Sequence, residues 1–123
     1  MRIVIVGAGE VGSSVAKNLS DDGHDIVIVE EDDNRAARVE NDLDVIMVKG
    51  NAARPSILAK AGITADNDDT SMLIACTNKD EVNIMACWIA KRMGVPHVIA
   101  RAVGLEFTDN ERWANDLGID MLI

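Results

Sequence analysis

Six short apolar runs alternate with five segments of helical periodicity along this chain. The apolar runs occupy residues 3–6, 26–29, 45–48, 72–76, 98–100 and 119–123. The helical segments occupy residues 10–20, 34–41, 55–61, 80–93 and 108–117. An uninterrupted apolar run is typical of a parallel strand that is covered on both faces. The alternation therefore predicts an α/β protein in which helices cover both faces of a parallel sheet.

Right-handed crossovers turn such an alternation into a doubly wound sheet. Six strands are the full count of a Rossmann-like dinucleotide-binding domain, which has the strand order 3-2-1-4-5-6. We expect that fold here. The 123 residues suffice for one core, and no linker or low-complexity stretch interrupts them. A single domain over residues 1–123 follows.

The charge of the chain narrows the choice of partners. Its 21 acidic residues against 12 Lys and Arg give a formal net charge of −9. Because such a surface repels phosphate backbones and anionic lipid, we expect no nucleic-acid binding and no docking on a membrane surface. No apolar run approaches the ~20 residues of a membrane span, so direct membrane insertion is not expected either. Two cysteines and two histidines without ligand spacing predict no metal site and a reducing, cytoplasmic location.

The segment Gly7–Gly12 has the sequence GAGEVG, which matches the pattern G-x-G-x-x-G. The pattern alone is weak, because glycines occur in any tight turn. Here it lies between a predicted strand and a predicted helix. Gly7 permits the turn, Gly9 lets the backbone approach a pyrophosphate, and Gly12 lets the helix pack closely on the sheet. Since a helix N-terminus also attracts anions, an acidic protein can bind a pyrophosphate at this loop.

Glu30 ends the second predicted strand. It follows the glycine loop by roughly the 20 residues at which such domains carry a carboxylate for the adenosine ribose hydroxyls. The acidic run Glu30–Asp33 would repel a 2′-phosphate, so NADP is disfavoured as a ligand. Arg35 is the only nearby cation that argues otherwise. The less specific alternative is that Glu30 is one more surface acid.

Three later loops follow strands three, four and five, at the edge where the ligand of such a sheet binds. Their small, amide and cationic residues can line an adenine, a second ribose and a phosphate or carboxamide. Each residue taken singly also fits ordinary turn chemistry, but their shared edge favours binding. The residues are Gly50, Asn51, Ala52, Thr77, Asn78 and Arg101.

These segments together resemble one family, the N-terminal nucleotide-binding domains of RCK (also called KTN) proteins, regulators of potassium uptake typified by the Trk system. The resemblance covers nearly the whole chain. It rests on the motifs IVIVGAGEVG, VIVE, VKGNAxRPSILxxAGI, ACTNKDEVNIMAC and VIAR. The third and fourth motifs are far more specific than the glycine loop, because general dehydrogenases lack them.

The resemblance implies that NAD(H), or an adenine nucleotide such as ATP or ADP, binds along this edge. It also implies assembly into a homo-oligomer, a dimer or a ring. The function implied is control of a membrane potassium transporter from its cytoplasmic side. The ligand contacts carried over position by position are Gly7, Ala8, Gly9, Glu10, Val11, Gly12, Glu30, Gly50, Asn51, Ala52, Thr77, Asn78 and Arg101.

Two departures from the family pattern stand out. Asn51 occupies a position where many relatives carry Asp, and relatives commonly continue into a second ligand-binding lobe, whereas this chain stops at Ile123. We therefore expect the second lobe to be absent from this chain. Glu10 at the start of the first helix favours NAD(H) over ATP, because its carboxylate opposes the extra terminal charge of a triphosphate.

The predicted helix 80–93 has an apolar stripe and a second group of large side chains. Val82, Met85, Ala86, Ile89 and Met93 share one arc and are expected in the core. The remaining large residues are expected on the outer surface, where they favour a contact between subunits. These are Ile84, Trp88 and, on the next helix, Trp113.

Two classes of function remain open. The first is a binding module that senses a nucleotide and has no catalytic residues. The alternative is the cofactor domain of an NAD-dependent oxidoreductase. That alternative needs a substrate domain and an acid or base facing the nicotinamide, and the chain contains no Tyr, no His at relay spacing and no Cys in a loop. We therefore expect a regulator and not an enzyme.

Overall fold

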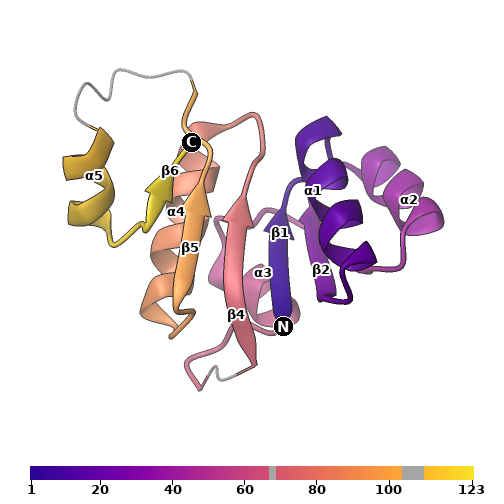
Figure 1. Ribbon diagram of the computed structural model, residues 1–123, viewed down its shortest axis with the longest axis horizontal. Helices are drawn as coiled ribbons and strands as arrows, with labels where there is room; N and C mark the ends of the chain where they lie inside the picture. The colour runs from indigo at the N-terminus through magenta and orange to yellow at the C-terminus, as the bar shows by residue number, and fades with distance from the viewer. Residues whose placement is uncertain (67–68, 104–109) are drawn as a thin grey trace.

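The computed structural model describes residues 1–66, 69–103 and 110–123. Within these residues, parallel strands form one sheet in the order β3-β2-β1-β4-β5-β6 (Figure 1). The strands are β1 (Arg2–Val6), β2 (Asp25–Glu30), β3 (Ile46–Lys49), β4 (Thr70–Ala75), β5 (His97–Ala100) and β6 (Met121–Leu122). The helices are α1 (Glu10–Asp21), α2 (Asp33–Asp42), α3 (Pro55–Lys60), α4 (Asp80–Arg92) and α5 (Asn110–Leu117). The predicted fold class and strand order are confirmed.

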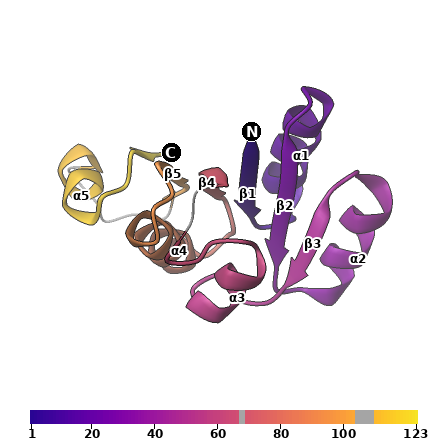
Figure 2. The same cartoon turned by 90° about the horizontal axis from the view of Figure 1, so that it is seen from below.

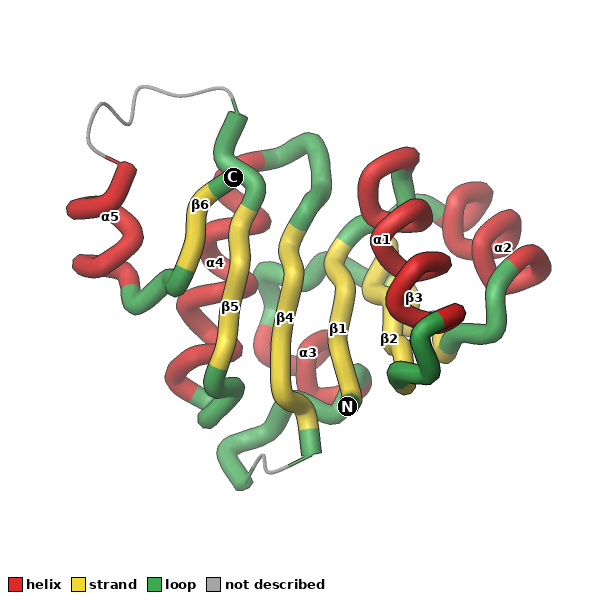
Figure 3. Tube along the Cα trace, viewed as in Figure 1, coloured by secondary structure: helices red, strands yellow, loops and turns green. Residues whose placement is uncertain are grey.

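The strand side chains alternate between two cores, one on each face of the sheet. Val4, Val27 and Leu73 pack with residues of α3 and α4. Ile5 and Ile28 pack with residues of α1 and α2 on the opposite face. The helices accordingly lie in two layers, one on each face of the sheet. Figure 2 shows this arrangement from below, and Figure 3 distinguishes helices from strands by colour. A sheet covered in this way explains why its strands appear as unbroken apolar runs in the sequence.

The last strand is shorter than the one predicted. The last strand, expected over 119–123, consists of Met121 and Leu122, which lie opposite Ile99 and Ala100 of β5. Ile119 is excluded because its N–H donates to the carbonyl of Ala114 (2.8 Å) and closes the end of α5. The helix expected over 108–117 begins, within the described residues, at Asn110. Residues 108 and 109 lie outside the described part of the chain.

The buried face of α4 is rotated from the one predicted. Met85, expected in the core, is 45% exposed, whereas Asn83 is fully buried. Ile84, expected on the outer surface, is partly buried and packs against the core. The predicted core face did not include Asn83. Its amide is instead satisfied by hydrogen bonds inside the protein, so it can be buried, and Met85 then faces outward.

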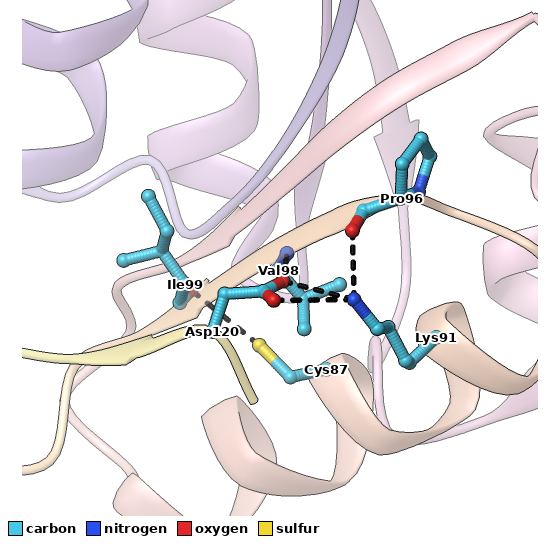
Figure 4. A network of polar contacts seen from close by, with 6 residues as sticks. All are labelled: Cys87, Lys91, Pro96, Val98, Ile99 and Asp120. Atoms are coloured by element: carbon cyan, nitrogen blue, oxygen red, sulfur yellow. Dashed lines mark hydrogen bonds and ion pairs between the residues drawn. The ribbon is translucent and has the colours of Figure 1, made fainter. Parts of the chain in front are cut away.

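A polar network joins α4 to β5 and the turn before β6 (Figure 4). The Lys91 ammonium donates to the Pro96 carbonyl (2.7 Å) and pairs with the Asp120 carboxylate (3.1 Å). The same carboxylate accepts the Val98 N–H (2.7 Å). The Cys87 thiol, on the same helix as Lys91, donates to the Ile99 carbonyl (3.4 Å). Burial, together with nearby Asp120, raises the pKa of Cys87 to about 12.

None of the helices within the described residues is long and apolar enough to cross a membrane.

Candidate functional site

The carboxyl ends of the strands form one edge of the sheet, at the top in Figure 1. Hydrogen bonds of the sheet continue past these ends and keep the following loops side by side. The bonded N–H and carbonyl pairs are Gly7 to Val29 (2.8 Å), Gly50 to Glu30 (3.0 Å), Cys76 to Val6 (2.9 Å) and Arg101 to Ala75 (2.8 Å). Four loops that are far apart in the sequence therefore meet along this edge.

A cavity of about 610 Å³ opens at this edge, a volume within the usual range for ligand pockets. Most of the predicted contact residues line it. They are Gly7, Gly9, Glu10, Val11, Glu30, Gly50, Asn51, Ala52, Thr77, Asn78 and Arg101. Ala8 and Gly12 do not line it: Ala8 lines a neighbouring groove between α1 and α2, and Gly12 lies beneath the loop.

The other lining residues are not among the contacts predicted from the sequence. They are Val6, Val29, Glu31, Asp32, Arg35, Cys76, Lys79 and Val82. Their position in the sequence could have indicated them, because most of these residues directly precede or follow a predicted contact. Arg35 and Val82 instead lie in the first turns of α2 and α4, which begin at the same edge of the sheet.

The glycine loop is held by close backbone contacts. Gly7 has a φ of +106°, which L side chains rarely adopt, and its Cα faces the main chain of Cys76 and Thr77. A Cβ at Gly12 would lie 1.9 Å from the Gly7 carbonyl oxygen, so α1 packs directly against the loop. Gly9 differs from both, because a Cβ there would meet nothing within 4 Å. Gly9 thus leaves its side of the cavity open.

The Glu30 carboxylate links the glycine loop to the start of α2. Its Oε1 accepts the Ala8 N–H (2.7 Å) and its Oε2 accepts the Asp32 N–H (2.8 Å). The residue is only 7% exposed, yet it lines the cavity. A carboxylate has about four acceptor positions, so two remain for hydroxyl donors from the cavity side. Two short charge-assisted bonds also fix the carboxylate in place.

Charge is distributed unevenly around the cavity. Glu30, Glu31 and Asp32, with Arg35 beside them, lie on the side of β2 and α2. Lys79 and Arg101 lie on the side of β4 and β5. A ligand that spans the cavity therefore meets carboxylate acceptors at one end and cationic donors at the other.

Cys76 lies in the floor of the cavity, next to the glycine loop. Burial raises the pKa of its thiol to about 11, although nearby Arg101 opposes the shift. The thiol is therefore protonated near neutral pH and is a poor nucleophile. Among the described residues, no group of three or more His, Cys, Asp or Glu side chains is arranged to hold a metal ion.

Comparison with known proteins identifies both a family and a fold. The family model of the TrkA-N domain matches residues 3–123. A Trk system potassium uptake protein TrkA homolog of Archaeoglobus fulgidus is 40% identical over 124 residues, which cover 100% of this chain and 27% of that protein. The chain thus spans about a quarter of the length of this relative.

Solved structures agree with the fold. The TrkA-N domain of the inner membrane protein ybaL from Escherichia coli has a TM-score of 0.81 at 22% identity, covering 99% of this chain and 85% of that one. The GsuK channel bound to NAD has a TM-score of 0.80 at 18% identity, with coverage of 99% and 21%. The same channel bound to ADP has a TM-score of 0.76 at 24% identity, with coverage of 99% and 30%.

Proposed function

This chain belongs to the TrkA-N domain family, and from that premise we propose that it is a regulatory nucleotide-binding domain acting on a membrane potassium transporter or channel. The proposed ligand is NAD(H), bound in the cavity at the carboxyl edge of the sheet. ATP and ADP are the competing ligands. Binding without turnover is proposed, because regulation requires only that the ligand favour one arrangement of the assembly over another.

The observation that carries this proposal is the position of the Glu30 carboxylate. It is held by the Ala8 and Asp32 amides, and it lines the same cavity as the glycine loop. Ribose hydroxyls are donors that suit its remaining acceptor positions. The open space at Gly9 and the N-terminus of α1 then suit a pyrophosphate. These residues fit a dinucleotide. We propose that it binds at this site without reacting.

The charges near Glu30 support NAD(H) over NADP(H). Glu31 and Asp32 line the cavity beside Glu30 and would repel a 2′-phosphate, which Arg35 alone would attract. Glu10 lies at the start of α1 and also lines the cavity. Its carboxylate opposes the terminal phosphate of ATP more than a pyrophosphate that carries a nucleoside at each end.

The names of the relatives support a proposal about partners. A relative that shares 40% of its residues is named as a potassium uptake protein, and the GsuK structures are those of a channel. We propose that this domain acts from the cytoplasmic side of such a membrane partner, as part of a homo-oligomer. Trp88 and Trp113 are 38% and 45% exposed, which suits a contact between subunits. The guanidinium carbon of Arg92 lies 4.6 Å from the centroid of the Trp88 ring, a cation–π contact on the same surface.

Titration calorimetry at one salt concentration tests the ligand. We expect NADH to bind best. NADPH and ATP should bind at least about tenfold more weakly than NADH, because the acidic groups around the cavity repel their additional phosphates. Preference for ATP or ADP would overturn the choice of nucleotide but not the regulatory role. If none of the five nucleotides NADH, NAD, NADPH, ATP and ADP bound, the proposal would be wrong.

Two further measurements test the other parts of the proposal. Loss of absorbance at 340 nm from NADH with carbonyl substrates would indicate an oxidoreductase, and we expect none. Sedimentation should show self-association that weakens by about tenfold or more in Trp88→Ser, since exposed tryptophans often dominate interfaces. Ile46→Ser, at the opposite edge of the sheet and 60% exposed, is the matched control. Equal effects of both variants would refute the proposed interface.

A further inference from the structure

Asn83 is the most completely hydrogen-bonded buried side chain near the cavity, although it does not line it. Its Oδ1 accepts the Thr77 N–H (2.9 Å) and the Thr77 hydroxyl (2.7 Å). Its Nδ2 donates to the Thr77 carbonyl (3.0 Å) and to the Arg101 carbonyl (2.9 Å). Both donors and both acceptor positions of the amide are therefore used.

The orientation of this amide is set by its partners. A backbone N–H can only donate, and a backbone carbonyl can only accept. The oxygen must therefore face the Thr77 N–H and the nitrogen must face the two carbonyls. A buried amide is costly unless its bonds are made, and here each bond goes to one of two residues that line the cavity.

Through these bonds, Asn83 holds the cationic side of the cavity in place. The main chain of Arg101 is held on both sides, since its N–H donates to the Ala75 carbonyl (2.8 Å) and its carbonyl accepts from Asn83. The loop after β4 is held at its second residue, Thr77, whose hydroxyl also accepts the Lys79 N–H (3.1 Å). One side chain on α4 thus connects the ends of β4 and β5.

We propose that Asn83 is a positioning residue for the bound nucleotide. It holds Thr77 and Arg101 where the half of a dinucleotide farther from Glu30 contacts them. This inference rests on the proposed function, because it takes the adenosine ribose to be bound at Glu30. It assigns to Asn83 a selective effect on ligands long enough to span the cavity.

The test compares NADH with AMP, which is half of a dinucleotide and reaches only the Glu30 side. In Asn83→Asp, a carboxylate oxygen replaces the amide nitrogen and faces the two carbonyls. The carboxylate cannot donate to these carbonyls and repels them, which displaces Thr77 and Arg101 but not the Glu30 side of the cavity. We therefore expect the affinity for NADH to fall about tenfold and the affinity for AMP to change by less than about twofold. Asn115→Asp, exposed on α5, makes the same charge change and should alter neither affinity.

A thermal melt of each variant separates positioning from a general loss of structure. If Asn83→Asp does not fold, Asn83→Ser is measured instead, with the same expected selectivity. NADH affinity that is unchanged in a folded variant, or that falls equally with AMP affinity, would overturn the inference. A wild-type chain that binds neither nucleotide would overturn the proposed function itself, so the two failures are distinguishable.

A double-mutant cycle supplies a readout that a purely structural role does not move. If Asn83 acts through Arg101, then Asn83→Asp should weaken NADH binding much less in an Arg101→Ala background than in the wild type. Additive losses in the double variant would show that the two residues act independently and would contradict the positioning role.

Discussion

In the N-terminal half of the sheet (β1 to α3), neighbouring elements are joined mainly by close contacts of glycine backbone, whereas in the C-terminal half (β4 to β6) they are joined by polar side chains. Gly7 and Gly12 let the loop and α1 approach within contact distance, and one carboxylate, Glu30, links them to α2. In the C-terminal half, the Asn83 amide joins the ends of β4 and β5 beside the cavity. The pair Lys91–Asp120 joins α4 to the turn before β6, at the opposite end of the strands.

The difference shows two ways of building one site. Close backbone packing leaves no tolerance for an added atom, so a change there affects the fold and the site together. A side-chain network holds its loops through a few separate bonds, so a change there can move one part of the site while the sheet stays intact. Variants of the first kind should therefore cost more stability than variants of the second kind.

The largest effect is expected from Gly12→Ala. In an ordinary helix interior this change would add about 1 kcal/mol of stability. Here the new Cβ would lie 1.9 Å from the Gly7 carbonyl oxygen, and backbone cannot move aside as a flexible side chain can. We expect the free energy of unfolding to fall by about 3 kcal/mol or more, measured by urea denaturation.

Gly9→Ala is the matched control within the same loop. Gly9 has a φ of −75°, and its Cβ would meet nothing within 4 Å. Its stability should change by less than about 1 kcal/mol. NADH affinity should nevertheless fall, because the methyl group points into the space proposed for the pyrophosphate. A Gly12→Ala variant as stable as Gly9→Ala would show that α1 does not pack on the loop as described.

Glu30→Ala should have the next largest effect, on both stability and binding. The substitution removes the acceptor for the Ala8 and Asp32 amides, and Ala8 is buried. We expect a loss of about 2 kcal/mol in the free energy of unfolding, typical of a hydrogen bond to a charged group. NADH affinity should fall in parallel, because the ribose acceptor and the loop support are the same carboxylate.

Glu31→Gln provides the comparison for this variant, because Glu31 also lines the cavity but is exposed. It should change stability by less than about 0.5 kcal/mol. If Glu30→Ala were as stable as Glu31→Gln while binding NADH poorly, Glu30 would serve the ligand alone and not the loop.

The same contrast explains how much could be predicted from the sequence. The strands, the glycine loop and Glu30 follow from local patterns, because an apolar run, a glycine spacing or a strand end reports its own environment. The buried face of α4 does not follow from a local pattern. The amide of Asn83 is fully hydrogen-bonded only with the carbonyl of Arg101, 18 residues later, in addition to its bonds to Thr77, and no local pattern contains that distant partner. Met85 and Ile84 were therefore assigned to the wrong faces of the helix.

The ion pair at the end of the sheet was missed for the same reason. Lys91 and Asp120 are 29 residues apart and lie on different elements, so neither position indicates the other. The contacts at the cavity edge were easier to predict, because carboxyl ends of parallel strands meet at one edge whatever their separation in sequence.

The smallest effect is expected from Asp120 and appears as a pH dependence of stability. Burial alone would raise the pKa of this carboxyl, but the Val98 N–H, Lys91 and His97 together hold the pKa below the ordinary 3.8. A carboxyl whose pKa is lower in the folded state stabilises the fold above the unfolded pKa. That contribution is lost as the pH falls below about 4 and through the folded pKa.

Asp120→Asn keeps an oxygen acceptor for Val98 and removes the charge that pairs with Lys91. The difference in unfolding free energy between wild type and this variant should therefore shrink as the pH falls below 3.8. Because the Asp120 side chain is 42% exposed, the difference near neutral pH should stay below about 1 kcal/mol. Asp116→Asn, an exposed change on α5, corrects for the altered net charge. A difference that grew toward low pH would mean that the Lys91–Asp120 network does not stabilise the C-terminal half.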